Sequence, residues 1–193
     1  MSKLTAADLM SLEQYARERP AFRARLLEHK SERQLAVGPH ATWCFEDRMT
    51  VQYQVQEMLR AERIFEPDGI AEELAVYNPL IPDGRNWKVT LLLEYQPSER
   101  PAALAGLKGV EDRCWMQVAG HDRVYAIADE DQERENAEKT SAVHFLRFEL
   151  DAAMTASLKG GAALAAGIDH EHYRHAVDPL PAAQRRALLA DLA

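Results

Sequence analysis

The chain has 193 residues, of which 47% are hydrophobic and 28% charged, and its formal net charge is -8. A chain of this length can bury enough apolar surface for one self-sufficient domain over residues 1–193, and nine Gly and nine Pro are too few for a fibrous or low-complexity protein. The acidic balance, without any basic block, excludes a protein that binds the phosphate backbone of nucleic acid.

The cellular location of the protein and the state of its cysteines are inferred from signals that the sequence lacks. The first ten residues, MSKLTAADLM, contain no apolar stretch typical of a secretory signal, and no apolar run approaches the roughly 20 residues that span a bilayer. The two cysteines, Cys44 and Cys114, lie far apart and predict neither a disulfide framework nor a thiolate zinc site. We therefore expect a cytoplasmic protein that does not enter a membrane.

Helical signals open the chain. Thr5 can cap a first short helix, and Pro20 ends it while suiting the first turn of a second helix. The next predicted elements are a hairpin of 34–37 with 42–45, the longest helix over 46–65 and a short helix over 69–77.

The middle of the chain shows strand alternation, and the end returns to helix. Segments 88–95 and 142–150 predict strands, while Gly120-His121 suits a two-residue hairpin that places Met116 opposite Tyr125 and Cys114 opposite Ile127. Asp151 can cap a helix that stops at Gly160-Gly161, and a last helix begins at Pro181. The pattern favours an α+β fold: an antiparallel sheet of about four or five strands covered by N- and C-terminal helices.

The helix over 46–63 carries the densest set of polar side chains. Tyr53, Glu57 and Arg60 recur at i, i+4 and i+7 and share one face, and Gln54 adds an amide beside Tyr53. One interpretation is a pocket wall that offers a phenol, a carboxylate and a guanidinium to a small ligand or metal. The other is a solvated ladder of ion pairs.

His144 has a different setting. Strand alternation places it on the face of Ala142, Leu146 and Phe148, which should be buried. A buried imidazole near a carboxylate can titrate, bind metal or carry protons, whereas a core histidine bonded to a carbonyl needs no function. If His144 faces Glu57, the functional interpretation is favoured.

Two further segments have two interpretations each. In the segment 169–175, His172 and His175 lie at helical metal-ligand spacing, or the segment is an exposed turn with Asp169 as a helix N-cap. The acidic run 129–138 is a cation site, a docking surface for a basic partner, or a solvated connection.

Several short segments of this sequence, spread over nearly the whole chain, resemble the bacterial domain-of-unknown-function 3501 family. They are Glu46-Asp-Arg48, Tyr53-Gln54, Glu57-Met-Leu-Arg60, Glu62-Arg63-Ile64, Tyr77 to Gly84, Tyr125 to Asp131, Lys139 to Glu149, and Asp169-His170 with Tyr173. The resemblance implies no defined activity, but a link to redox or peroxide stress through neighbouring rubrerythrin-like and iron–sulfur proteins. Of the clustered histidines only His170 matches the family pattern, which disfavours a metal site at His172 and His175.

These observations lead to one main hypothesis and two alternatives. The main hypothesis is a small-ligand- or metal-binding accessory protein of a redox system, in which Arg60 or Arg63 holds an anion while Glu57 and His144 position a cation or exchange protons. Tyr53, Gln54, His170 and Tyr173 complete the predicted binding residues. The alternatives are a small acid–base enzyme that uses Glu57 with His144, and an interaction module whose acidic run 129–138 docks a partner. The sequence does not identify a cofactor.

Overall fold

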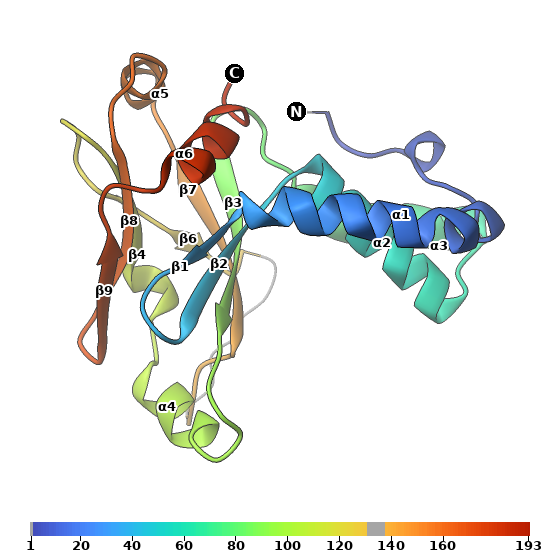
Figure 1. Ribbon diagram of the computed structural model, residues 1–193. Helices are drawn as coiled ribbons and strands as arrows, with labels where there is room; N and C mark the ends of the chain where they lie inside the picture. Colours follow the sequence, from blue (N-terminus) through green and yellow to red (C-terminus); the bar gives the residue numbers. More distant parts are fainter. Residues whose placement is uncertain (1, 131–137) are drawn as a thin grey trace.

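The computed structural model describes residues 2–130 and 138–193, and in it the chain forms a body of strands with a helical arm on one side (Figure 1). The α+β fold with antiparallel strands is confirmed. Positions 131–137, which hold most of the acidic run, are outside the described residues, so docking through this run stays a prediction.

The arm contains α1 (Leu12–Ser31), α2 (Arg48–Glu62) and α3 (Pro67–Tyr77). The predicted break at Pro20 is wrong, because α1 continues through this residue. The N-cap of α1 is Ser11, whose hydroxyl accepts from the backbone amide of Gln14. Tyr15 and Phe22 are buried on either side of Pro20, and this packing outweighs the one helical hydrogen bond that proline removes. Thr5 and Asp8 do form a capping box, but on a single 3-10 turn, Ala6–Asp8.

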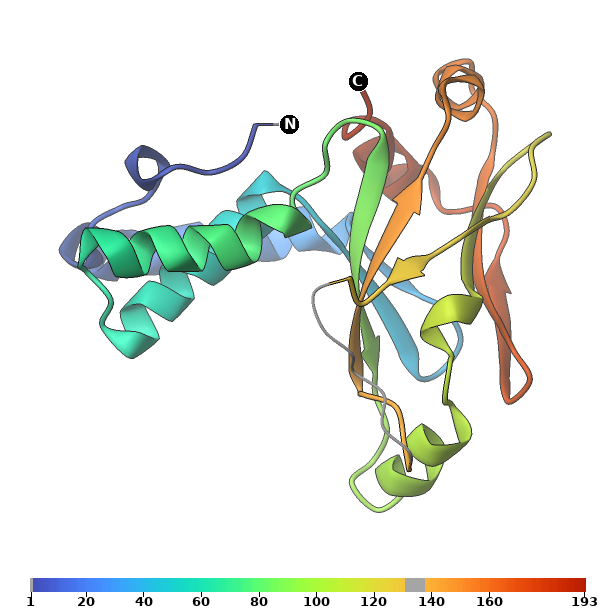
Figure 2. The ribbon, with the colours of Figure 1, turned by 180° about the vertical axis from the view of Figure 1, so that it is seen from behind.

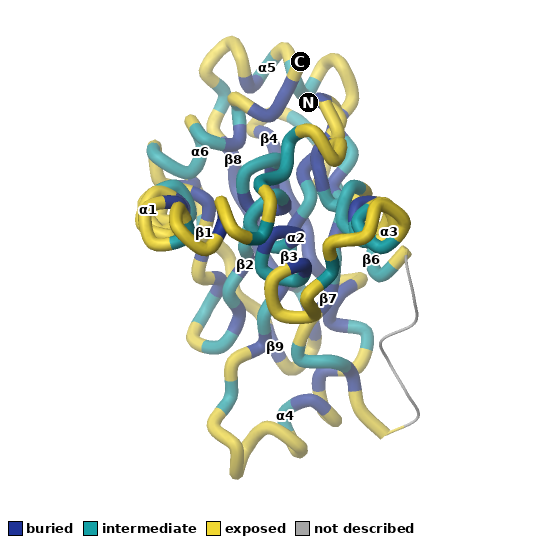
Figure 3. The backbone as a smooth tube through the Cα atoms, turned by 90° about the vertical axis from the view of Figure 1, so that its right-hand side faces the viewer, coloured by how far each residue is buried: buried dark blue, intermediate teal, exposed yellow. Residues whose placement is uncertain are grey.

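The arm has a hydrophobic core of its own. The predicted long helix is confirmed as α2, with Asp47 as its N-cap, and its apolar stripe packs on α3 and on the N-terminal segment. This core consists of Leu4, Val51, Val55, Leu59, Leu74 and Ile81. The outer sides of α1 and α3 are exposed (Figure 3).

The body consists of two antiparallel sheets. The first has the order β1 (Gln34–Ala36), β2 (Ala41–Glu46), β3 (Asn86–Leu93), β7 (Val143–Glu149) and β6 (Ile127–Ala128). The second has the order β5 (Val124–Tyr125), β4 (Cys114–Val118), β8 (Leu164–His170) and β9 (Tyr173–Val177).

Both sheets contribute to one hydrophobic core, which explains why they face each other (Figure 2). Trp43 on β2 stacks on Phe148 of β7, with ring centroids 5.3 Å apart. Three short helices lie at the margins of the body: α4 (Arg100–Gly106), α5 (Ala152–Lys159) and α6 (Ala182–Leu189). The N-cap predicted at Asp151 is confirmed, and the last helix begins directly after Pro181, within one residue of the predicted start. In the described residues no helix has the length and apolar character needed to cross a membrane.

The predicted hairpin register around Gly120 is wrong. Met116 pairs with Val124 and Trp115 with Tyr125, because the turn is longer than two residues. Ile127 does not face Cys114 but pairs with Arg147 in the other sheet. The chain passes from one sheet to the other after β5, and the alternation of residues within a strand does not show which sheet the strand joins.

The segment around 169–175 forms a β-hairpin, β8–β9, so Asp169 is not a helix N-cap and His172 and His175 do not share a helix face. A contact with the neighbouring strand explains why β8 has a glycine at position 167. A side chain at Gly167 would lie 2.5 Å from the Trp115 ring, so only glycine leaves room for this indole.

Candidate functional site

Glu57 lies in the arm and has partners there. Its carboxylate accepts from the Tyr15 hydroxyl at 2.7 Å and from two nitrogens of Arg19 at 2.7 and 2.8 Å. The hydrogen bonds from Arg19 are the main reason that the pKa of Glu57 falls to about 2. His144 lies in the body on β7 and makes its contacts there, so the structure does not bring Glu57 and His144 together (Figure 1).

The other predicted binding residues of α2 do not form one pocket wall. Tyr53 packs edge-to-face on Phe22, with ring centroids 5.7 Å apart. Gln54 donates to Glu46 at 3.4 Å. Arg60 and Arg63 are exposed, and Arg63 ends α2 in the left-handed conformation. This face therefore combines packing with a solvated ion pair.

Glu57→Gln should lower the free energy of unfolding by about 1 kcal/mol at pH 7, because Arg19 and Tyr15 lose a carboxylate that is only partly shielded from water. The lowered pKa makes this stabilisation fully present above about pH 4.5 and lost as the pH falls towards 2. The difference from wild type should therefore shrink in acid. Urea unfolding at pH 7 and pH 3 measures it, with exposed Glu62→Gln as the control. An equal loss at both pH values would contradict the ion pair as its source.

His144 is the centre of a buried polar cluster. Its side chain is 0% exposed, and Nδ1 lies 2.6 Å from Oδ2 of Asp129. Because a carboxylate can only accept, Nδ1 carries the proton and donates. The other ring nitrogen, Nε2, lies 3.0 Å from Oγ1 of Thr140, 3.1 Å from the Ser141 carbonyl and 3.8 Å from Oε2 of Glu111.

Four segments converge to build this cluster. Glu111 begins the 3-10 turn Glu111–Arg113, Asp129 follows β6, Thr140 and Ser141 precede β7, and His144 is on β7. Asp129 adopts the left-handed conformation, with a φ of 46°, and its second oxygen accepts from the Phe145 amide at 2.9 Å. Backbone and hydrogen bonds together hold this carboxylate against the imidazole.

The sequence predicted only part of the cluster. Alternation in β7 correctly predicts that His144 is buried, and Asp129 is the first residue of the acidic run for which a cation site was one interpretation. Glu111 has no sequence signal, because it is a single acid in a short turn and reaches His144 only through the packing of the two sheets.

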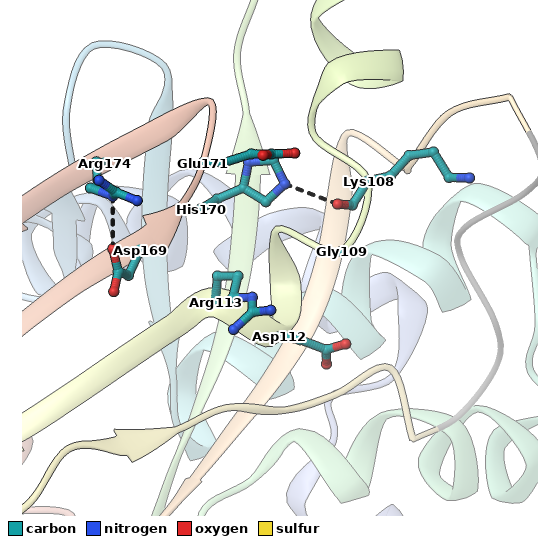
Figure 4. A pocket seen from close by; sticks show the side chains of 8 residues that line it. All are labelled: Lys108, Gly109, Asp112, Arg113, Asp169, His170, Glu171 and Arg174. Atoms are coloured by element: carbon teal, nitrogen blue, oxygen red, sulfur yellow. Dashed lines mark hydrogen bonds and ion pairs between the residues drawn. The ribbon is translucent and has the colours of Figure 1, made fainter.

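His170 and Tyr173 lie elsewhere, on the β8–β9 hairpin. His170 accepts from the His172 amide through Nδ1 and donates through Nε2 to the Lys108 carbonyl at 3.0 Å, which joins the hairpin to the turn after α4. Tyr173 donates to the Val37 carbonyl and accepts from the His40 amide, which joins β9 to the β1–β2 hairpin. Of these two residues, His170 lines a pocket of about 590 Å³ (Figure 4).

The molecule is thus an α+β protein with a buried cluster of one histidine and two carboxylates. The chain belongs to the family described as "Protein of unknown function (DUF3501)", whose model matches residues 3–192. It is similar to a novel protein of unknown function from Burkholderia pseudomallei K96243, known from a crystal structure at 1.90 Å resolution. The two share 49% identity over 100% of both chains, with a TM-score of 0.94. No curated protein matches the chain.

Proposed function

We propose that this protein binds a divalent transition-metal ion through His144 and Glu111, and acts as a metal-binding accessory protein. The observation that carries the proposal is the convergence of Glu111, Asp129 and His144, whose donor atoms all lie within 4.8 Å of one another. Donors that share one metal at bond lengths near 2.1 Å lie roughly 3–3.5 Å apart, close to the spacings around Nε2.

Asp129 has a supporting part in this proposal. It binds Nδ1, which leaves Nε2 as the nitrogen that faces Glu111, Thr140 and Ser141 and that would ligate the metal. A carboxylate that orients a ligating histidine in this way is a recurrent feature of metal sites, and its removal commonly costs 10–100-fold in affinity. One imidazole nitrogen among oxygen donors suits Mn²⁺, Fe²⁺ or Zn²⁺ better than Ca²⁺ or Mg²⁺.

Burial favours an ion over a substrate. The hydroxyl of Thr140, the imidazole and Asp129 have the order of a nucleophile–base–acid triad, but Thr140 is 2% exposed and His144 0%. An organic substrate would have to displace core residues to reach them, whereas a single ion needs only its ligands. The acid–base enzyme that uses Glu57 has no support from the contacts of either side chain.

The test uses metal-stripped protein titrated with Mn²⁺ and with Zn²⁺ by calorimetry. Wild type should bind one ion, and His144→Gln and Glu111→Gln should each weaken binding at least tenfold. His172→Gln, at an exposed histidine, should change nothing and so controls for adventitious binding. If circular dichroism shows that His144→Gln does not fold, the metal affinity of Glu111→Gln, at the edge of the cluster, tests the proposal. Absence of saturable binding to wild type, or wild-type affinity in both variants, would refute the proposal.

The redox association and the cytoplasmic location are also parts of this proposal: the first rests on the family resemblance and the second on the sequence. The metal that copurifies with the protein tests the redox association, because iron at this site would favour a redox role and zinc would not.

A further inference from the structure

A second site lies on the surface, where the turn after α4, the 3-10 turn Glu111–Arg113 and the β8–β9 hairpin enclose the pocket of about 590 Å³. Its volume is in the range of pockets that hold small metabolites. None of its lining residues carries an apolar side chain, so the pocket suits a polar ligand. The lining residues are Lys108, Gly109, Asp112, Arg113, Asp169, His170, Glu171 and Arg174.

Contacts within the protein hold one wall in place. Asp169 is paired with Arg174 at 3.0 Å and with Arg123 at 3.6 Å, and Arg123 in turn lies over the Trp115 ring at 3.9 Å. His170 uses both ring nitrogens and is therefore neutral, with its proton on Nε2. His170 is buried and hydrogen-bonded at both ring nitrogens, so it is held in place before any ligand arrives, which lowers the entropic cost of binding.

The opposite wall offers two charges of opposite sign. Asp112 and Arg113 follow each other on one turn, and in the described part of the chain neither side chain makes a hydrogen bond or ion pair. Figure 4 shows both side chains at the pocket, and shows the Lys108 ammonium extending away from the other lining groups. A guanidinium binds a carboxylate with two parallel hydrogen bonds, and a carboxylate accepts from an ammonium or hydroxyl group.

We infer that this pocket binds a small carboxylate with a neighbouring hydrogen-bond donor, that is, an α-amino or α-hydroxy acid. Arg113 holds the carboxylate of the ligand, and Asp112 accepts from its amino or hydroxyl group. A simple anion satisfies Arg113 but is repelled by Asp112, so the pair selects ligands that carry both groups. This inference is independent of the metal site.

Three probes of equal carbon-chain length test the inference by calorimetry at constant ionic strength: L-glutamate, 2-hydroxyglutarate and glutarate, which lacks the α donor. At least one of the first two should bind saturably and more tightly than glutarate, and the difference between them identifies the donor. Arg113→Gln should weaken this binding at least tenfold, and Asp112→Asn should remove most of the preference over glutarate. Exposed Arg186→Gln is the control.

No saturable binding of any probe, or unchanged affinity in Arg113→Gln, would overturn the inference, and equal affinity for glutarate would overturn the role of Asp112. Binding should persist in metal-stripped protein and in Glu111→Gln, so failure of the metal proposal and failure of this one are distinguishable.

Discussion

Arg33→Met should lower the free energy of unfolding by about 3–5 kcal/mol at pH 8, because it leaves two buried carboxylates without their shared cation. Arg33 and Asp191 are 4% and 2% exposed and form an ion pair, and Nε of Arg33 lies 3.3 Å from Asp47. The same guanidinium donates to carbonyls of β2, so one side chain links the end of α1, the start of α2 and the C-terminal segment.

This loss should be smaller at pH 5. Burial raises the pKa of Asp191 to about 6, and the Arg33 charge acts in the opposite direction. A carboxyl whose pKa is raised on folding favours the folded state below its unfolded pKa, and this advantage is lost as the pH rises through the folded value. Without Arg33 the Asp191 pKa rises further, so at pH 5 the group stays neutral and costs little.

Urea unfolding at the two pH values measures both effects. Adding Asp191→Asn to Arg33→Met should recover part of the stability at pH 8, because it removes the buried charge of Asp191, whereas Asp47 keeps its contacts with His29 and the Thr50 amide. Arg186→Met, at an exposed arginine 4.0 Å from Glu32, should stay within about 0.5 kcal/mol of wild type. A loss below 1 kcal/mol in Arg33→Met at pH 8 would show that the network does not support the fold.

Trp43→Ala should lower the free energy of unfolding by about 3–5 kcal/mol, because it removes a buried indole ring from the core that the two sheets share. Trp43 is 0% exposed and stacks on Phe148, so its loss leaves a cavity that neither strand can fill. Phe65→Ala is the matched control, since this ring is 67% exposed and should cost less than about 0.5 kcal/mol.

Circular dichroism in urea follows both variants without depending on tryptophan fluorescence. Similar losses for Trp43→Ala and Phe65→Ala would mean that the two sheets do not form a close-packed core around Trp43.

Much of the fold was predictable because its signals are local. The periodicity of α2 and the alternation of β3 and β7 each lie within one element, and both are confirmed. The β8–β9 hairpin was missed, since its alanines and glycine lack the β-branched side chains typical of strands and its histidines have helical spacing. Gly167 is small because the Trp115 ring occupies its side-chain space, a contact across strands that no sequence window contains.

The α+β class, the helical state of α2 and the burial of His144 could all be read from the amino-acid pattern, because each depends on the repeat of a single helix or strand. The acids that lie beside His144 could not, since they depend on how distant segments pack. Glu57 is held in the arm by Arg19. Asp129 reaches the imidazole because β6 pairs with β7, and Glu111 reaches it because the two sheets share one core. Side-chain partners distant in sequence are set by how whole elements pack, and that packing has no periodicity along the chain.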